Sequence, residues 1–264
     1  MQPIRAIPVS LCRSLEVLLT DLDDTLTEGG MLPPSSYAAL WELYRAGIQV
    51  APVTGRPAGW CDHLARMWPV AGVVGENGAF VYVYHREEKL MERRYLLCEA
   101  ERLEGARRLE VVKRRVLAEV PACGISADQG FRAADLAIDI REDVAPLARE
   151  QVERILEIAR QEGATCKLSS IHVNIWYGSF DKVAGIREFL RLSGKGELED
   201  FQERILFIGD SPNDEPLFQA LKSSVGVANI APFLDRLHHP PAYLTERPAA
   251  AGFCEAVSTI LSRR

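Results

Sequence analysis

Short apolar runs that each end in a polar loop recur in the first and last thirds of the chain, and amphipathic segments follow most of these loops. Unbroken runs of this length are typical of strands that are buried on both faces of a parallel sheet. The repeated order of strand, polar loop and helix predicts an α/β fold with right-handed crossovers. The expected strands are residues 17–19, 48–53, 70–74, 80–84, 204–209, 225–228 and 243–244, and the expected helices start near Pro34, Pro57, Lys182 and Phe253.

The pattern changes between residues 86 and 177, where charged amphipathic helices and alternating strands replace the buried runs. This composition predicts a small open-faced sheet with helices on one side. We expect it to be an inserted α+β domain at 86–177, within a discontinuous core made of 1–85 and 178–264. Its expected elements are helices at 99–119 and after Pro146, and strands at 135–141, 164–168 and 171–177.

Composition narrows the class of protein. The chain has 264 residues, 47% of them hydrophobic and 26% charged, with a formal net charge of -6. An acidic chain of this kind is not expected to bind nucleic acid. Its six cysteines are scattered without a CxxC pair, which is typical of reduced thiols. We find no signal peptide and no apolar stretch long enough to span a membrane, so we expect a cytoplasmic protein.

Acidic residues follow the first buried strand, where Asp21 and Asp23 stand two positions apart. Side chains at this spacing point the same way on an extended segment. Two carboxylates about 4 Å apart repel by about 4 kcal/mol at an effective dielectric constant of about 20, so a cation or a shared proton is needed. Open α/β sheets place their sites beyond the carboxyl ends of strands, which is where these residues lie.

Other polar residues are expected at the same edge of the sheet. Thr54 and Asp210 each follow a predicted strand, Asp214 stands four residues later, and Lys182 starts a predicted helix. Oxygen ligands without histidine or cysteine favour magnesium over softer metals. A carboxylate beside such an ion can attack a phosphate ester and form an acyl phosphate. Lys182 and Thr54 are placed to bind the phosphoryl oxygens.

Four motifs in this order resemble those of the haloacid dehalogenase superfamily of phosphatases. The segment ENGAF (76–80), just before the insertion, is similar to subfamily IIB, whose members carry a type C2 cap and include sucrose, trehalose and mannosyl-3-phosphoglycerate phosphatases. The resemblance implies a Rossmann-like parallel-sheet core with an inserted α+β cap. The motifs are DLDDTL (21–26), VTGRP (53–57), DK (181–182) and GDSPND (209–214).

The resemblance also implies roles for individual residues. Asp21 is expected to be the nucleophile and a metal ligand. Asp23 is expected to protonate the leaving oxygen and then activate water, with its backbone carbonyl on the metal. The other implied residues are Thr54 and Lys182 on the phosphoryl group, Asp210 and Asp214 at a magnesium ion, and Arg56 and Asn213 as residues that either contact substrate or structure their loops.

The expected strand at 171–177 suggests how the cap contacts substrate. One of its faces is apolar, and the other carries His172, Asn174 and Trp176, which in similar caps look down on the site. An aromatic ring with polar neighbours suits a sugar, and Arg141 or Lys167 would meet a second anionic group. The alternative interpretation is that these residues form only the solvent-exposed face of a sheet.

We therefore expect a magnesium-dependent phosphatase that acts on a small phosphorylated metabolite, either a sugar or a glycosyl phosphate, through an aspartyl phosphate. One alternative is a phosphomutase of the phosphomannomutase type. Another is a phosphoacceptor regulatory module that does not turn over, although in modules of the receiver type the lysine follows the acidic residues, whereas Lys182 precedes Asp210 here. The expected partner is a small phosphate ester, with neither nucleic acid nor membrane, and the sequence leaves the oligomeric state open.

Overall fold

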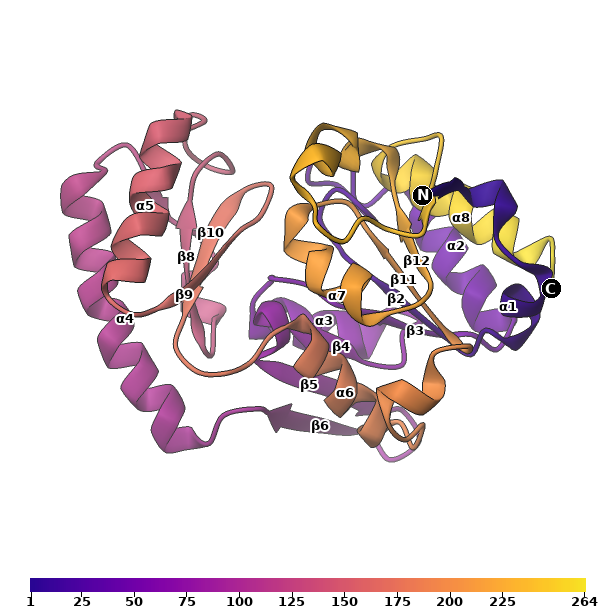
Figure 1. Ribbon diagram of the computed structural model, residues 1–264. Helices are drawn as coiled ribbons and strands as arrows, with labels where there is room; N and C mark the ends of the chain where they lie inside the picture. Colours follow the sequence, from indigo (N-terminus) through magenta and orange to yellow (C-terminus); the bar gives the residue numbers. More distant parts are fainter.

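The computed structural model describes residues 1–264, which fold into two lobes (Figure 1). The larger lobe is built on a six-stranded sheet in the order β1-β13-β12-β11-β2-β3, and every pairing in it is parallel. This arrangement confirms the predicted α/β fold. The strands are β1 (Gln2–Pro3), β13 (Tyr243–Leu244), β12 (Ser224–Gly226), β11 (Ile205–Gly209), β2 (Val17–Thr20) and β3 (Gln49–Pro52).

Helices cover both faces of this sheet because its central strands are apolar on both sides. Leu18 of β2 belongs to a core shared with the helices of one face, whereas Val17 and Leu19 belong to a core shared with those of the other. The first core is formed with α2 (Pro34–Arg45), α3 (Ala58–Met67) and α8 (Ala249–Leu261), and the second with α6 (Lys182–Leu192) and α7 (Glu215–Ala220). The remaining short helices of this lobe are α1 (Val9–Ser14), η1 (Ile4–Ala6), η2 (Glu76–Gly78), η4 (Leu198–Phe201), η5 (Pro212–Asp214) and η6 (Ala228–Arg236).

A three-stranded antiparallel sheet extends the larger lobe toward the smaller one. Its strands are β4 (Val73–Gly75), β5 (Phe80–His85) and β6 (Leu90–Tyr95), and a parallel bridge between Val53 and Val74 joins it to the main sheet. The sequence did not predict β6, because half of its residues are charged and none is buried, as is common in an edge strand. Strand β6 thus lies within the range 86–177 that we assigned to the inserted domain, although it pairs with β5 of the larger lobe. The exact domain boundaries stay a prediction.

The smaller lobe has a four-stranded antiparallel sheet in the order β7-β8-β10-β9. Two helices cover one face of it, and their apolar residues share a core with Ile138, Val173 and Ile175 of the sheet (Figure 1). The elements are β7 (Gly124–Ile125), β8 (Asp135–Asp139), β9 (Thr165–Leu168), β10 (His172–Trp176), α4 (Glu99–Glu119), α5 (Arg149–Gln161) and the short η3 (Gln129–Phe131).

The second face of this small sheet is also covered. Every residue of β8 and β10 is buried, including those at the polar positions of the alternating pattern. Asp139 and His172 on this face contact the loop at residues 141–143 of the smaller lobe itself, whereas Trp176 contacts the larger lobe. Trp176 stacks on Phe180 with ring centroids 5.5 Å apart and belongs to the core of the larger lobe.

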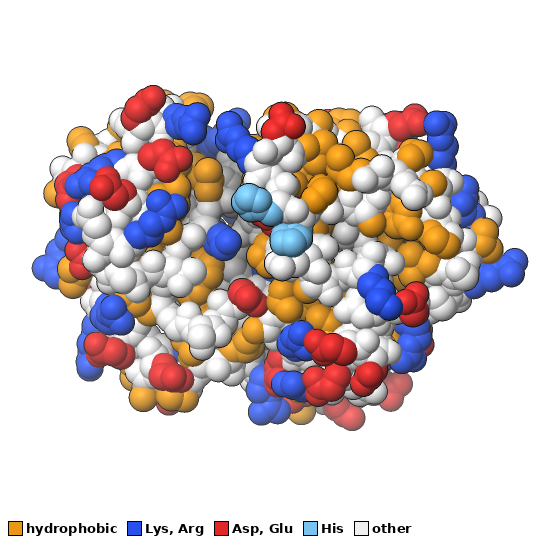
Figure 2. All heavy atoms as spheres, viewed as in Figure 1, with side chains coloured by type: hydrophobic (Ala, Val, Ile, Leu, Met, Phe, Trp, Pro, Cys, Tyr) orange, Lys and Arg blue, Asp and Glu red, His pale blue; other side chains and the backbone are white.

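The surface carries charges of both signs. On the face shown in Figure 2, basic and acidic side chains are interspersed over both lobes, and a furrow runs between the lobes. None of the helices combines the length and the apolar composition that crossing a bilayer requires.

Candidate active site

The carboxyl ends of three adjacent strands bring the predicted polar residues together. Asp21 follows β2, Thr54 lies two residues beyond β3, and Asp210 follows β11, and these strands are neighbours in the sheet. Lys182 is the first residue of α6, whose start is capped by the Asp181 side chain accepting a hydrogen bond from the N–H of Ala184. The fold thus gathers one ammonium group and several carboxylates at one edge.

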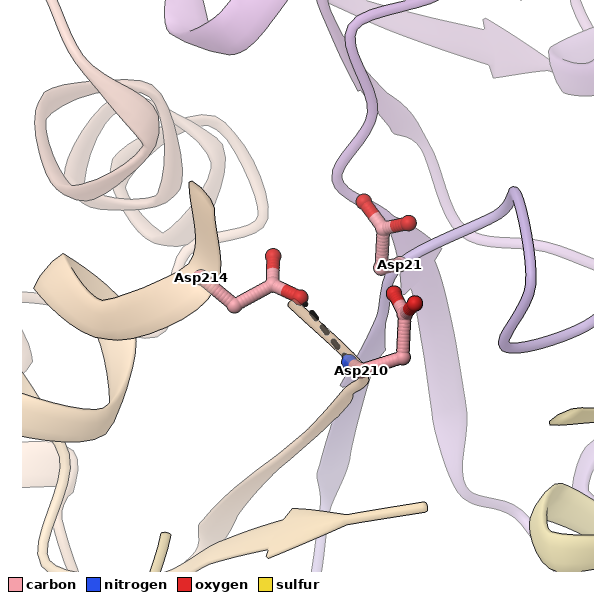
Figure 3. A group of neighbouring side chains, drawn as sticks. All are labelled: Asp21, Asp210 and Asp214. Atoms are coloured by element: carbon pink, nitrogen blue, oxygen red, sulfur yellow. Dashed lines mark hydrogen bonds between the residues drawn. The ribbon is translucent and has the colours of Figure 1, made fainter. Parts of the chain in front are cut away.

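Three of these carboxylates form a compact cluster. Oxygen atoms of Asp21, Asp210 and Asp214 all lie within 4.8 Å of one another, and all three residues are buried. Figure 3 shows their side chains converging from the ends of the strands and from the turn that carries Asp214. The Nζ atom of Lys182 donates hydrogen bonds to Asp21 and Asp214, each over 2.7 Å.

The cluster has more carboxylates than positively charged groups. Burial raises the pKa of Asp21 to about 7, although Lys182 opposes the rise. Burial and the two neighbouring carboxylates raise the pKa of Asp210 well above its usual range. Burial alone would lower the pKa of Lys182, but Asp21 and Asp214 hold it above its ordinary value. One ammonium against three carboxylates leaves excess negative charge, which a bound cation would neutralise.

The donor atoms of the cluster suit a hard divalent cation, because all of them are carboxylate oxygens. Surrounding groups orient them. Asp210 accepts hydrogen bonds from the Thr25 hydroxyl and the Asn229 amide. Asp214 accepts the backbone N–H groups of Asp210 and Ser211, and the first of these bonds is the dashed line in Figure 3. Asp21 and Asp210 are therefore the residues best placed to bind a metal, and Asp214 holds the Asp210 backbone and Lys182 in place.

Asp23 lies outside this cluster and forms an ion pair with Arg56. The Arg56 Nε and Nη2 atoms donate to the Asp23 carboxylate over 2.9 to 3.2 Å. Arg56 also reaches two acidic residues of the smaller lobe, with Nη2 2.9 Å from Glu142 and Nη1 3.6 Å from Asp128. Glu142 and Asp128 were not predicted from the sequence, because neither belongs to a recognisable motif.

A small cavity of about 20 Å³ lies between the lobes and above the cluster. Only one of its 13 lining residues is hydrophobic. They comprise eight predicted site residues, Asp21, Asp23, Thr54, Arg56, His172, Asn174, Asp210 and Asn213, and five that the sequence analysis did not single out, Gly55, Ser169, Ser170, Ile171 and Ser211.

The other predicted site residues lie elsewhere. Asp214 belongs to the carboxylate cluster and Lys182 donates hydrogen bonds to it, and both residues are buried. Arg141 and Lys167 are exposed and do not line the cavity, and Trp176 is only 2% exposed within the core. Their proposed contacts with substrate stay predictions that these positions do not support.

A buried glutamate connects the two lobes beside the cavity. The Glu76 carboxylate accepts backbone N–H groups from Ala58 of the larger lobe and from Ala133, Ala134 and Asp135 of the smaller one, over 2.7 to 3.2 Å. The sequence placed Glu76 only in a turn before the insertion. No local pattern identifies a carboxylate whose donors come from residues 57 to 59 positions away in the chain.

Comparison with known proteins agrees with this geometry. Residues 18–101 match the family described as haloacid dehalogenase-like hydrolase. Phosphoglycolate phosphatase 1 of Saccharolobus solfataricus is 26% identical to this chain, over 94% of it and 96% of that protein. A Thermoplasma acidophilum structure aligns with a TM-score of 0.71 and 18% identity over 94% of this chain and 98% of its own. The sucrose-phosphatase of Synechocystis sp. PCC6803 aligns with a TM-score of 0.63 and 16% identity over 93% and 97%.

The match begins inside β2, includes the first two motifs, and ends in α4 of the smaller lobe. The structural relatives reproduce both lobes, because the alignments cover nearly all of each chain. Residues 18–101 therefore match the haloacid dehalogenase-like hydrolase family, and nearly the whole chain shares its two-lobed fold with these solved structures.

Proposed function

We propose that this phosphatase hydrolyses a small, polar phosphate monoester with the help of Mg²⁺, and that a phosphorylated Asp21 is its intermediate. The observation that carries the proposal is the contact of Asp21 with Lys182 inside a cluster of carboxylates at the edge of the cavity. A carboxylate held there by an ammonium group is positioned to attack phosphorus.

In the first step, an Asp21 oxygen forms a bond to phosphorus and the bond from phosphorus to the ester oxygen breaks. The leaving oxygen takes a proton from Asp23. In the second step, Asp23 removes a proton from water, which attacks the acyl phosphate and releases inorganic phosphate and free Asp21. Both residues line the same cavity, which supports this division of roles.

The remaining residues of the site stabilise charge. Lys182 and Thr54 are proposed to bind the phosphoryl oxygens, and Lys182 also limits repulsion between Asp21 and Asp214. Asp21, the Asp23 backbone carbonyl and Asp210 would hold Mg²⁺, supported by Asp214. The ion, when bound, offsets negative charge on the carboxylates and on the transferred phosphoryl group.

The cavity lining supports a small, hydrophilic substrate. Its polar walls include the hydroxyls of Ser169 and Ser170 and the side chains of His172 and Asn174. The related protein named phosphoglycolate phosphatase 1 makes a phosphorylated carboxylic acid the first compound to test. Sugar phosphates are the second class, because the fold also matches a sucrose-phosphatase. A volume of about 20 Å³ holds little more than one water molecule, so the lobes must separate to admit either substrate.

The proposed compartment is the cytoplasm. All six cysteines are free thiols, including the exposed Cys98. Such thiols persist where glutathione and thioredoxin keep proteins reduced.

The test is phosphate release from 2-phosphoglycolate, a panel of sugar phosphates and p-nitrophenyl phosphate, with Mg²⁺ or with EDTA. We expect turnover that requires Mg²⁺ and that falls at least about a thousandfold in Asp21→Asn, because the amide is a poor nucleophile. Asp235→Asn makes the same change of charge at an exposed position and is the matched control.

Other results of this experiment would contradict the proposed residue roles or identify a different function. Full activity in EDTA would contradict the metal assignment, and an active Asp21→Asn variant would contradict the nucleophile. Turnover only in the presence of a sugar bisphosphate would identify a mutase. A stable aspartyl phosphate on the folded protein, without release of phosphate, would identify a regulatory module.

A further inference from the structure

The guanidinium group of Arg56, which lines the cavity, connects the two lobes. It comes from the loop after β3 of the larger lobe, and its side chain is only 6% exposed. The Nη2 atom lies 2.9 Å from an oxygen of Asp23 and also 2.9 Å from Oε1 of Glu142, which belongs to the smaller lobe. A single nitrogen is therefore shared between a carboxylate of the active site and one of the cap.

The remaining contacts leave Arg56 little freedom to move. The Trp60 ring lies below the guanidinium at 4.4 Å, and Asp128 approaches the other side, 3.6 Å from Nη1. Burial works against the charge, but Asp23 and Glu142 hold the pKa of Arg56 above its ordinary value. Because the cation is largely shielded from water, its position depends on the carboxylates that surround it.

Glu142 is itself held by the smaller lobe. Its Oε2 atom lies 2.9 Å from Nε2 of His172, which is part of β10 and lines the cavity. The contact with His172 and the charge of Arg56 lower the pKa of Glu142 to about 2. Glu142 therefore follows the smaller lobe, and it meets Arg56 only when the lobes are together as they are here.

We propose that Glu142 is a positioning residue which, through Arg56, sets where the Asp23 carboxylate lies when the lobes close. The inference rests on the proposed function, in which Asp23 gives its proton to the leaving oxygen as the bond between that oxygen and phosphorus breaks. With Glu142 in place, Arg56 divides its charge among Asp23, Glu142 and the more distant Asp128. Without Glu142, Asp23 takes a larger share of that charge and is held more tightly against the guanidinium, away from the leaving group.

The experiment compares two kinds of leaving group in Glu142→Gln. An alkyl phosphate, the best one of the panel above, needs its leaving oxygen protonated, whereas acetyl phosphate and p-nitrophenyl phosphate release anions stable enough to depart without a proton. We expect kcat/KM for the alkyl phosphate to fall about 10- to 100-fold more than for the other two, since general acid catalysis contributes about 10²- to 10⁴-fold. Asp143→Asn, an exposed neighbour, is the matched control.

An equal loss on all three substrates, or no loss on any, overturns the inference, because a merely structural change lowers every reaction alike. Glu142→Asp keeps the charge but is one methylene shorter, so it should show the same selective loss to a smaller extent if Glu142→Gln does not fold. Wild-type protein that turns over none of the substrates would instead overturn the proposed function.

Discussion

At the scale of the single residue, Lys182 has the most demanding position. It is 3% exposed and lies between two buried carboxylates, so its ammonium group neutralises charge that water does not reach. Breaking a buried pair by removing one partner costs about 3–5 kcal/mol, because the other partner remains charged and unpaired. The same ammonium group is the donor that we assign to the transferred phosphoryl group.

We therefore predict that Lys182→Met lowers kcat by about 10²- to 10³-fold and the free energy of unfolding in EDTA by about 3 kcal/mol. Steady-state kinetics and urea unfolding measure the two effects. Lys195→Met removes a partly exposed lysine that pairs with Glu16, and should change stability by at most about 1 kcal/mol. Activity of Lys182→Met within tenfold of wild type would contradict the assigned role.

At the scale of the element, the position of α6 depends on a close approach of two backbones. Gly78 of η2 has φ of +104°, and a Cβ atom added to it would lie 1.9 Å from the carbonyl oxygen of Asp181 and 3.0 Å from the nitrogen of Lys182. Glycine is thus required both by its conformation and by the space available. The turn before the insertion consequently sets where α6 begins and where Lys182 points.

We predict that Gly78→Ala shifts the start of α6, lowers stability by about 4 kcal/mol or more, and reduces kcat. Gly194 is the matched control, because its φ is +67° but nothing lies within 4 Å of an added Cβ. Gly194→Ala should lower the free energy of unfolding by only about 1 kcal/mol, because only the unfavourable backbone conformation contributes there. Equal losses of stability in the two variants would show that the contact with Asp181 is unimportant.

At the scale of the whole molecule, Glu76 ties the lobes together. Its two oxygens accept N–H groups from both lobes, and Arg132 of the smaller lobe donates to the carbonyl oxygen of Gly55 nearby. These contacts hold the smaller lobe over the cavity. Opening the site must therefore expose several of these buried polar groups, unless the loop at residues 132–135 moves with the larger lobe.

We predict that Glu76→Gln destabilises the protein by about 1–3 kcal/mol. The side-chain nitrogen of glutamine is a donor, so the backbone N–H groups that now bond to one carboxylate oxygen would lose their acceptor. Amide exchange should quicken at residues 133–135, as measured by hydrogen–deuterium exchange. Glu153→Gln, on the exposed face of α5, should leave both quantities unchanged. Unaltered exchange at residues 133–135 in Glu76→Gln would argue against this contact between the lobes.

Much of the fold and of the core site was predictable from the sequence, for a local reason. Strands buried on both faces are continuous apolar runs, and the residues that follow them in a parallel sheet meet at one edge. The positions of Asp21, Thr54 and Asp210 follow from this rule. Strand β6 was not predictable because a charged edge strand lacks that signature.

The sequence by itself determined the order of the elements, the parallel sheet and the gathering of acidic residues, because each depends on neighbours in the chain. Only the tertiary structure decided which polar residues of the smaller lobe reach the cavity. The alternation in β10 puts His172, Asn174 and Trp176 on one face, but what covers that face depends on how the lobes meet. The first two residues line the cavity, and Trp176 packs on Phe180. The partners of Arg56 and Glu76 in the smaller lobe could not be predicted for the same reason. Groups distant in sequence form ion pairs and hydrogen bonds only once the lobes are packed together.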